Sequence, residues 1–227
     1  MMPNVYNQRS HSSVSRRETE TNASFGIGII DYGMGNIYSV KKALEFFGQK
    51  TRVISRPQDI RRYNKIVLPG VGAFDDAITQ LQKQDLIFAL KEHIKNKKVL
   101  LGICLGMQLL FEGSDEAKKK NGLGIIKGKV KRFAAIRGLK VPHIGWNQLR
   151  LKNTCPLLKD IPDNAYVYFC HSYYSVPWDK NVIVATCDYG REFAAVVWQD
   201  NVYGVQFHPE KSQQIGLKVL ENFIKLC

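Results

Sequence analysis

The first half of the chain alternates short apolar runs with segments of helical periodicity, and this alternation limits the folds open to it. Apolar runs of strand length stand in FGIGIIDYG, TRVISRP, YNKIVLPG and VLLGICLG. Between them, NIYSVKKALEFFG and AFDDAITQLQKQDLIFALKEHIKNKK carry apolar residues three or four positions apart, which is typical of helices. Strands that alternate with helices favour a parallel sheet covered on both faces. We therefore predict an α/β fold.

The second half of the chain changes character. Aromatic and β-branched runs occur in IIKGKVKRF, HIGWNQLRL, AYVYFCHSYYSV, NVIVATCDY, FAAVVWQD and VYGVQFHPE, separated by Gly, Asn and Asp. Some of these strands must pair antiparallel, and IGLKVLENFIKLC ends the chain as an amphipathic helix. We predict one domain over residues 25–227, with a single mixed, mostly parallel sheet flanked by helices and additional antiparallel strands. Residues 1–24 are polar, and we expect them to be disordered.

The composition excludes several classes of protein. No run reaches the roughly 18 apolar residues of a membrane-spanning helix, so we expect no membrane contact. The five cysteines are scattered and lack CxxC spacing, which disfavours a disulfide framework and a zinc site. We accordingly expect a cytoplasmic protein without a bound metal.

The chain is strongly basic, with 33 Lys and Arg residues against 20 Asp and Glu and a net charge of +13. Residues 1–24 contribute only one of these positive charges, since three arginines there face two glutamates. Such a field attracts nucleic acid, an acidic protein face or phosphorylated metabolites, or simply belongs to a solvated lysine-rich surface. No motif that binds DNA or RNA accompanies the charge, so we expect no nucleic acid partner.

Cys104 lies in the segment Gly102-Ile103-Cys104-Leu105-Gly106, directly after an apolar run and before a predicted helix. This is the cysteine form of a nucleophile elbow, in which a sharp strand-to-helix turn requires glycine two positions before and after the nucleophile. A helix N-terminus stabilises a thiolate, and the amide of Leu105 can face an oxyanion. The alternative is a buried structural cysteine.

A cysteine nucleophile needs a base, and His208 in GVQFHPE is the best placed of the five histidines. Pro209 keeps the residue before it extended. His208 and Glu210 then leave the same side of an extended segment, so the carboxylate can orient the imidazole toward Cys104. Of the other histidines, His143 and His171 fit satisfied core positions, and His93 is predicted to be exposed on a lysine-rich helix.

The segment IVLPGVGAF ends a predicted strand in a Gly-Val-Gly loop. Such a loop beside the elbow can offer amide hydrogens to an oxyanion. The alternative is an ordinary turn that ends the strand, and from the residues alone we favour this alternative.

GICLGMQLLFE and GVQFHPEKS together resemble the class I (triad) glutamine amidotransferase family, which has a flavodoxin-like fold. Further segments resemble the glutaminase subunits of imidazole glycerol phosphate synthase, namely IIDYGMGNIYSVKKALE, LPGVGAFDDAI, GLGIIKGKVKRF, VPHIGWNQL and YFCHSYY. The resemblance covers the chain from about residue 26 to its end.

The resemblance implies hydrolysis of glutamine to glutamate and ammonia through a cysteine thioester, with no cofactor. It implies catalytic roles for Cys104, His208 and Glu210, and an oxyanion hole formed by the amides of Val71 and Leu105. The positions that match glutamine-binding residues of the family are Gly72, Gln108, Ser172 and Tyr173.

The resemblance also implies a heterodimer with a cyclase subunit. The cyclase receives the ammonia and makes imidazole glycerol phosphate and aminoimidazole carboxamide ribotide, in histidine biosynthesis. The positions that match the interface with this partner are Asn36, Trp146, Asn147, Tyr168 and Lys211. A large amphipathic ring such as Trp146 suits an interface, with a core tryptophan as the alternative, and Lys211 fits either a solvated lysine or a partner carboxylate.

Two other functions remain open from the sequence. The first is an ammonia-supplying glutaminase subunit of a sugar-modifying amidotransferase in surface-glycan synthesis. The second is a binding module without catalytic activity that uses its basic charge, which the intact set of Cys104, His208 and Glu210 disfavours.

Overall fold

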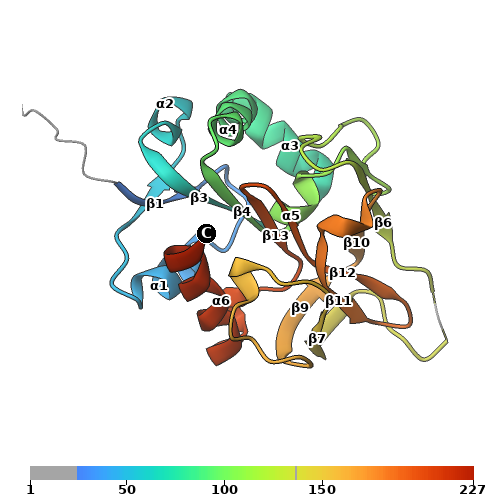
Figure 1. Ribbon diagram of the computed structural model, residues 1–227. Helices are drawn as coiled ribbons and strands as arrows, with labels where there is room; N and C mark the ends of the chain where they lie inside the picture. The colour runs from blue at the N-terminus through green and yellow to red at the C-terminus, as the bar shows by residue number, and fades with distance from the viewer. Residues whose placement is uncertain (1–24, 136) are drawn as a thin grey trace, which may run out of the picture.

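An eight-stranded sheet runs through the centre of the protein (Figure 1). The computed structural model describes residues 25–135 and 137–227, so the predicted disorder of residues 1–24 lies outside the described part of the chain. In spatial order the strands of the sheet are β2 (Thr51–Ile54), β1 (Phe25–Ile30), β3 (Tyr63–Gly70), β4 (Val99–Cys104), β13 (Val202–Val205), β12 (Glu192–Gln199), β11 (Ile183–Asp188) and β8 (Arg150–Leu151).

The pairing in this sheet changes direction along its width. Strands β2, β1, β3, β4 and β13 pair in parallel, whereas β12, β11 and β8 continue the sheet antiparallel. The prediction of a mixed, mostly parallel sheet extended by antiparallel strands from the second half is therefore confirmed. Because β3, β4 and β13 are parallel neighbours, their carboxyl ends open onto one edge of the sheet, where ligands bind in open α/β folds.

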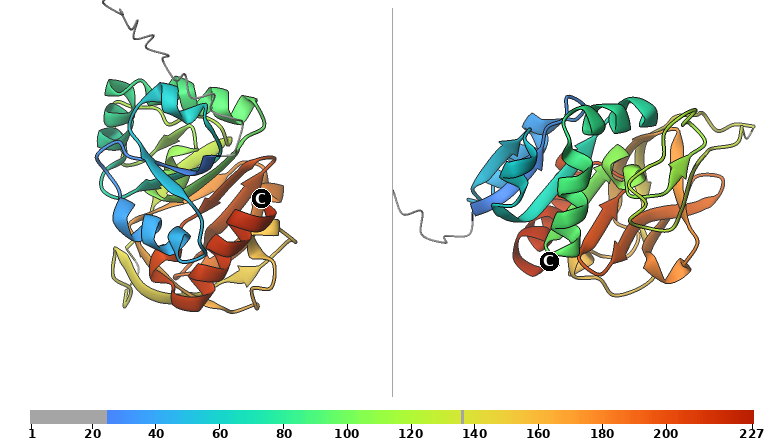
Figure 2. Two further views of the ribbon diagram at one scale, coloured as in Figure 1. Left: turned by 90° about the vertical axis from the view of Figure 1, so that its left-hand side faces the viewer. Right: turned by 90° about the horizontal axis from the view of Figure 1, so that it is seen from above.

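Helices cover both faces of the sheet (Figure 2). One buried core contains Leu44 of α1 (Ile37–Glu45) and Phe223 of α6 (Gln213–Leu226). The core on the opposite face contains Ile78 of α3 (Phe74–Lys83), Leu90 of α4 (Leu86–Lys95) and Met107 of α5 (Leu105–Leu109). A further short helix, α2 (Pro57–Ile60), connects β2 to β3. The apolar stripes seen in the sequence are the faces that these helices bury.

Two small sheets supplement the large one. The first consists of β10 (Tyr173–Pro177), β6 (Gly128–Arg132) and β5 (Gly113–Ser114), and the second pairs β7 (His143–Gln148) with β9 (Tyr166–His171) in antiparallel register. Strands β9 and β10 are separated only by Ser172, so this one residue joins the two small sheets. As shown below, the end of β9 and the start of β10 lie beside Cys104.

The helical stretch predicted over residues 73–98 is broken into α3 and α4. The break falls at Asp85, whose φ of +55° is left-handed and cannot continue a helix. The prediction that His93 is exposed is wrong, because this side chain is only 3% exposed and its Nε2 lies 3.0 Å from the carbonyl oxygen of Val99. His93 lies on the buried face of α4 with Leu86, Ala89 and Leu90, and its bond to Val99 joins the helix to β4.

Helix α5 begins at Leu105, directly after Cys104, and ends at Leu109, earlier than the predicted end near Gly113. A returning loop supplies the reason. The amide of Leu123 donates to the carbonyl of Leu109, and the amide of Ile125 donates to that of Leu110. These bonds satisfy carbonyls that a longer helix would use.

Candidate active site

Cys104 stands at the junction of β4 and α5 in a strained backbone conformation, with φ of +54° and ψ of −110°. The neighbouring glycines explain how this turn is possible. A Cβ on Gly106 would lie 1.8 Å from the carbonyl oxygen of Leu68, and a Cβ on Gly102 would lie 2.8 Å from the backbone of Gly106. The strand and the helix therefore approach each other more closely than any side chain allows, as an elbow requires.

The thiol of Cys104 is 5% exposed but it is not enclosed in the core, because it lines a cavity of about 270 Å³. The imidazole of His208 lines the same cavity, although the two residues are far apart in the sequence. Burial alone lowers the pKa of His208, but hydrogen bonds to Cys104 and Glu210 and the negative charges of these groups outweigh it and raise the pKa to about 10. The predicted nucleophile and base are thus brought together.

Glu210 holds the other side of the imidazole. Its Oε1 lies 2.9 Å from Nδ1 of His208, and both side chains are almost completely buried. The predicted pairing is present, but not on an extended segment, because Pro209–Lys211 forms a 3-10 turn after the extended His208. The turn folds the carboxylate back beneath the ring, so Nδ1 is occupied and Nε2 is left for Cys104.

The backbone of His208 is held in turn by β9 and by Ser212. Its amide donates to the carbonyl of Tyr168 over 2.9 Å, and the buried hydroxyl of Ser212 donates to its carbonyl over 2.7 Å. The same hydroxyl accepts the amide of Tyr168 over 2.9 Å. Ser212 was not identified from the sequence, where a serine after His-Pro-Glu-Lys carries no distinguishing signal.

The residues expected to bind glutamine and an oxyanion surround the cavity. Its lining contains the predicted residues Val71, Gly72, Leu105, Gln108, Ser172 and Tyr173, together with Glu116, Pro142, Cys170 and His171, which the sequence did not indicate for this site. Much of the lining lies at or just after the carboxyl ends of β3, β4, β9 and β13, and the rest includes the start of β10 and α5. The site therefore lies at the carboxyl edge of the parallel strands.

The loop after β3 lies beside the elbow, because Gly70 is the register partner of Cys104 in the parallel pair of β3 and β4. Val71 follows it and is 43% exposed, and Gly72 has a left-handed φ of +96° that favours glycine. Val71 and Leu105, the two predicted oxyanion donors, both line the cavity that contains the thiol, one from the loop after β3 and the other from the start of α5.

Gln108 and Gln206 form a buried amide pair next to the thiol. Nε2 of Gln108 donates to the carbonyl oxygen of Tyr173 over 2.9 Å and to Oε1 of Gln206 over 3.1 Å. Nε2 of Gln206 then lies 3.8 Å from the sulfur of Cys104. Both amide hydrogens of Gln108 are used within the protein, so only its Oε1 is left to meet a ligand.

Three of the predicted partner residues form one group near the cavity. Trp146 is 44% exposed, so the core alternative is wrong, and its ring meets the ring of Tyr168 edge-on at 6.0 Å. Nζ of Lys211 lies 5.9 Å from the centre of the Tyr168 ring, and Lys211 also lines the cavity. Asn147 directs its amide inward instead, donating to the carbonyl of Asp188 over 2.8 Å.

Asn36 is placed differently. It precedes α1, where its carbonyl accepts the amide of Val40 over 3.2 Å, and it is half-buried. Helix α1 nevertheless packs against the turn that carries Glu210, so Asn36 lies on an element next to the catalytic segment.

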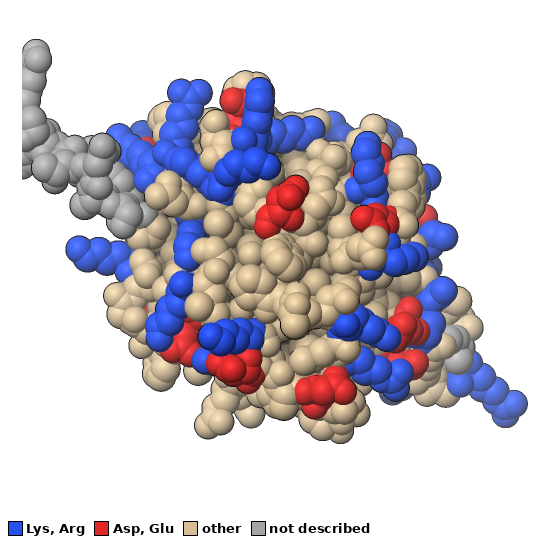
Figure 3. Space-filling view, viewed as in Figure 1, with Lys and Arg blue, Asp and Glu red and all other residues tan. Residues whose placement is uncertain are grey.

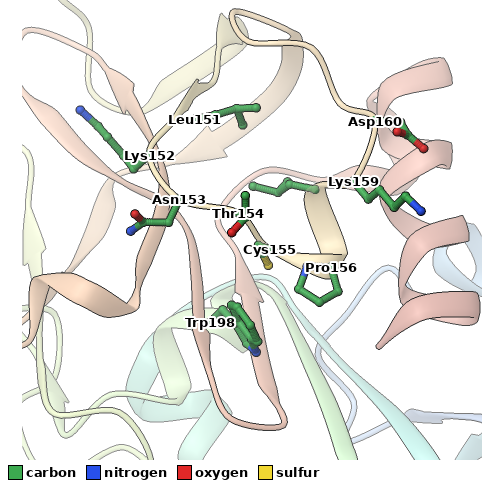
Figure 4. A pocket seen from close by; sticks show the side chains of 10 residues that line it. Leu151, Lys152, Asn153, Thr154, Cys155, Pro156, Lys159, Asp160 and Trp198 are labelled. Carbon is green, nitrogen blue, oxygen red and sulfur yellow. The ribbon is translucent and has the colours of Figure 1, made fainter.

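A larger cavity of about 680 Å³ contains none of the predicted site residues. Figure 4 shows that its walls come from the segment after β8 and from Trp198 near the end of β12. Because β12 runs antiparallel to β13, Trp198 lies at the edge of the sheet opposite to Cys104. The volume of a cavity therefore does not identify the candidate active site in this protein. The site is identified by the titratable side chains that meet in the smaller cavity.

Basic side chains surround one face of the protein rather than forming a single patch on it. Figure 3 shows Lys and Arg mostly around the rim of this face, smaller groups of Asp and Glu, and a centre that is mainly uncharged apart from one acidic group. No helix among the described residues is long and apolar enough to cross a membrane. The described residues also hold no cluster of three or more His, Cys, Asp or Glu side chains suited to a metal ion.

Comparison with known families agrees with this geometry. Residues 28–226 match the model of the family "Glutamine amidotransferase class-I". The chain belongs to the class-I glutamine amidotransferase family. Within it, the chain is 48% identical to the imidazole glycerol phosphate synthase subunit HisH of Syntrophotalea carbinolica over 87% of its own length and 98% of that protein.

Other relatives carry the same name. The HisH subunit of Caldanaerobacter subterraneus subsp. tengcongensis is 50% identical over 87% of this chain and 96% of that protein, and the one from Bacillus subtilis is 46% identical over 88% and 96%. This amidotransferase therefore groups with HisH. The structure of PurLQS from Thermotoga maritima shares the fold, with a TM-score of 0.70 and 20% identity over 87% of this chain and 96% of that one.

Proposed function

We propose that this chain hydrolyses glutamine to glutamate and ammonia and passes the ammonia to a cyclase subunit, in the imidazole glycerol phosphate synthase reaction of histidine biosynthesis. The observation that carries the proposal is that Cys104 and His208 line one cavity, while Glu210 bonds to the imidazole of His208 from behind. A thiol on an elbow, an imidazole beside it and a carboxylate behind the imidazole form a nucleophile, a base and an orienting group.

In the first step, Nε2 of His208 accepts the proton of the Cys104 thiol, and the thiolate attacks the side-chain carboxamide carbon of glutamine. Glu210 keeps the proton on Nδ1 and stabilises the imidazolium that forms. The raised pKa of His208, to about 10, supports this arrangement because it favours the protonated imidazole beside a thiolate. The dipole of α5 contributes in the same direction.

The attack moves negative charge onto the carboxamide oxygen. The amides of Val71 and Leu105 are the donors proposed for this oxygen, because both residues line the cavity beside Cys104, from the loop after β3 and from the start of α5. The imidazolium of His208 then gives its proton to the departing nitrogen, which leaves as ammonia. A thioester remains on Cys104, and water attacks it after losing a proton to His208, which releases glutamate and restores the thiol.

Glutamine itself is proposed to lie along the cavity wall formed by Gly72, Ser172, Tyr173 and Gln108. Because both amide hydrogens of Gln108 bond within the protein, its Oε1 is the atom available to accept from the α-ammonium group of the substrate. A small cavity whose wall combines apolar side chains with a few fixed polar groups suits one small ligand.

The partner is proposed to bind over Trp146, Tyr168 and Lys211, with Asn36 and Asn147 near the edge of this surface. Tyr168 joins this surface to the catalytic segment directly, because its carbonyl accepts the amide of His208. A cyclase seated here would touch residues that fix the base. Ammonia released at Cys104 would then be covered by the partner rather than lost to solvent.

In this proposal the β3 loop reaches a productive conformation only when partner and ribotide are bound, since binding that favours one loop state shifts its population. The isolated chain is then nearly inactive. The high positive charge is proposed to complement an acidic partner face, and weaker association at high salt would accompany it. The five free cysteines fit a cytoplasmic location, which is part of the same proposal.

The deciding experiment co-purifies the chain with its candidate cyclase and measures glutamine turnover with and without the ribotide substrate. We expect turnover to depend on both the cyclase and the ribotide. Absence of turnover in the complete mixture would refute the proposed activity. Fast turnover by the chain alone would refute the dependence on a partner.

The two other functions are separated by simple measurements. Rescue of a histidine auxotroph that lacks this subunit distinguishes the histidine pathway from surface-glycan synthesis, and the HisH relatives favour the histidine pathway. A diazoketone analogue of glutamine should label Cys104. Tight DNA binding without labelling would instead support a basic binding module.

A further inference from the structure

Two buried histidines face each other behind the cavity, outside the group of three proposed for catalysis. His143 begins β7, His171 ends β9, and the two residues are register partners in that antiparallel pair. Nδ1 of His143 lies 3.1 Å from Nε2 of His171, and the residues are 2% and 6% exposed. His171 also lines the cavity that contains Cys104.

The direction of each hydrogen bond in this pair follows from its partners. Nδ1 of His171 lies 2.7 Å from the carbonyl oxygen of Tyr173, which can only accept, so Nδ1 carries the proton. In a neutral imidazole the other nitrogen is then an acceptor, so Nε2 of His171 receives Nδ1–H of His143. Nε2 of His143 is in turn an acceptor, and Nδ2 of Asn147 donates to it over 3.3 Å.

The amide of Asn147 is oriented by independent contacts. Its Nδ2 also donates to the carbonyl of Asp188, and its Oδ1 accepts the backbone amide of Gln148, both over 2.8 Å. The contacts of Asn147 and the carbonyl of Tyr173 therefore both require that each group in this series of hydrogen bonds donates toward Tyr173. A protonated imidazole at either position would place two donors face to face.

The surroundings keep both rings neutral. The ring of His143 stacks against Tyr189 at 3.9 Å and against Phe169 at 4.8 Å, and Phe133 lies 5.4 Å from the ring of His171. Burial among these rings lowers the pKa of His143 to about 4 and, with the charge of its neighbours as a smaller cause, that of His171 to about 3. Each nitrogen thus has one fixed role at neutral pH.

The carbonyl held by His171 has a second partner that leads to the nucleophile. The oxygen of Tyr173 accepts Nε2 of Gln108, which also donates to Gln206, and this leaves Nε2 of Gln206 pointing at the sulfur of Cys104. Without the bond from His171, the carbonyl that orients the amide of Gln108 would be held only by the pairing of β10 with β6. The imidazole behind this carbonyl therefore helps to fix the order of the amide pair.

We propose that His143 and His171 are positioning residues for the proposed glutaminase reaction, which hold the carbonyl of Tyr173 and through it the amides of Gln108 and Gln206 beside Cys104. This inference rests on the proposed function. The pair also connects Asn147, next to the exposed Trp146, with the glutamine pocket by an unbroken chain of hydrogen bonds.

The first test compares two substitutions of His171, each of which places a side-chain amide group where one of the two ring nitrogens lies. In His171→Asn, the side-chain amide nitrogen occupies the place of Nδ1 and preserves the bond to Tyr173. In His171→Gln, the side-chain amide occupies the place of Nε2 and preserves only the bond to His143. We expect KM for glutamine to be about tenfold higher in His171→Gln than in His171→Asn, a difference expected of one lost hydrogen bond. The assay uses the complex with the cyclase and the ribotide.

The control for this test is His93→Gln, which alters a buried histidine remote from the cavity and should leave KM unchanged. A merely structural His171 would give the two variants equal KM values and equal losses of thermal stability. Equal KM values, or the reverse order, overturn the proposal.

The second test needs no variant and no activity. In ¹⁵N-labelled protein at pH 7, imidazole ¹⁵N chemical shifts should show both His143 and His171 as neutral rings with the proton on Nδ1. A charged ring, or a proton on Nε2 of His171, overturns the proposal even if the chain is an active glutaminase. If the wild-type complex hydrolyses no glutamine, the proposed function fails and this measurement still decides the arrangement.

Discussion

Nδ1 of His208 lies 2.9 Å from Oε1 of Glu210, and the second carboxylate oxygen, Oε2, is buried with no hydrogen-bond partner among the described residues. A buried carboxylate with an unsatisfied oxygen destabilises the fold unless a neighbouring positive charge compensates for it. The imidazolium of His208 is that charge. The pair is therefore built for the state in which His208 is protonated.

Replacing Glu210 with Gln should remove this charge while keeping the shape of the side chain. An amide nitrogen facing Nδ1 favours the wrong tautomer of His208, and in a comparable triad such a change lowers kcat by about 10⁴-fold. We expect glutamine-dependent synthesis by the complex to fall by roughly 10²- to 10⁴-fold, measured as initial rates. Synthesis from added ammonia should be unchanged, and a parallel loss of both rates would contradict the assigned role.

The raised pKa of His208 also predicts how stability depends on pH. Its pKa in the folded protein is about 10, against an ordinary value of 6.5. The folded state therefore holds the proton more tightly, and the resulting stabilisation is complete below pH 6.5 and is lost as pH rises toward 10. The melting temperature should fall between pH 6.5 and pH 9.5, and this fall should be smaller in His208→Gln. Parallel pH profiles for the two proteins would contradict this.

The elbow glycines offer a steric test. In Gly106→Ala the new methyl group would lie 1.8 Å from the carbonyl oxygen of Leu68, so β3 and α5 must separate. Overpacking of this kind typically costs about 1–3 kcal/mol, and here it also displaces the sulfur. We expect a lower melting temperature and slower labelling of Cys104 by a diazoketone analogue of glutamine. Gly113→Ala is the control, since a Cβ there meets nothing within 4 Å.

Much of this architecture could be predicted because local signals agree with the tertiary structure. Cys104 between Gly102 and Gly106 indicated the elbow, and apolar runs of strand length indicated β1 to β4. The residues of the cavity wall were harder to predict. His171 and Pro142 reach the site because β7 and β9 form a small separate sheet, and the alternation within a strand shows which face is buried but not which distant strand it pairs with.

The directions in which individual side chains point could also not be predicted from the sequence. Ser212 and Gln206 lie within the segment GVQFHPEKS, but its residue types do not show that the Ser212 hydroxyl donates to the carbonyl of His208 or that the amide of Gln206 faces the sulfur of Cys104. His93 shows the same limit, because lysines around it indicated an exposed helix face. His93 nevertheless continues the buried stripe of α4 formed by Leu86, Ala89 and Leu90, a helical spacing that starts only after the break at Asp85.

The buried imidazole of His93 should make the folded protein less stable in acid. Burial lowers its pKa in the folded protein to about 4, below the ordinary value of 6.5. The folded state therefore binds the proton less readily, so the stabilisation is complete above pH 6.5 and is lost as pH falls toward 4. In His93→Gln the amide nitrogen can keep the bond to the carbonyl of Val99. We expect the melting temperature of this variant to fall less than that of wild type between pH 7 and pH 4.5.

Cys104→Ser should separate the glutaminase from the synthase. A serine hydroxyl has a far higher pKa than a thiol and is not ionised by His208, so the variant cannot form the acyl intermediate at a useful rate. We expect glutamine-dependent synthesis by the complex to disappear while synthesis from added ammonia proceeds at the wild-type rate. Cys227→Ser, which changes a half-exposed thiol at the end of α6, should retain both. Loss of both activities in Cys104→Ser, together with a lowered melting temperature, would instead mean that the thiol holds the elbow together and is not the nucleophile.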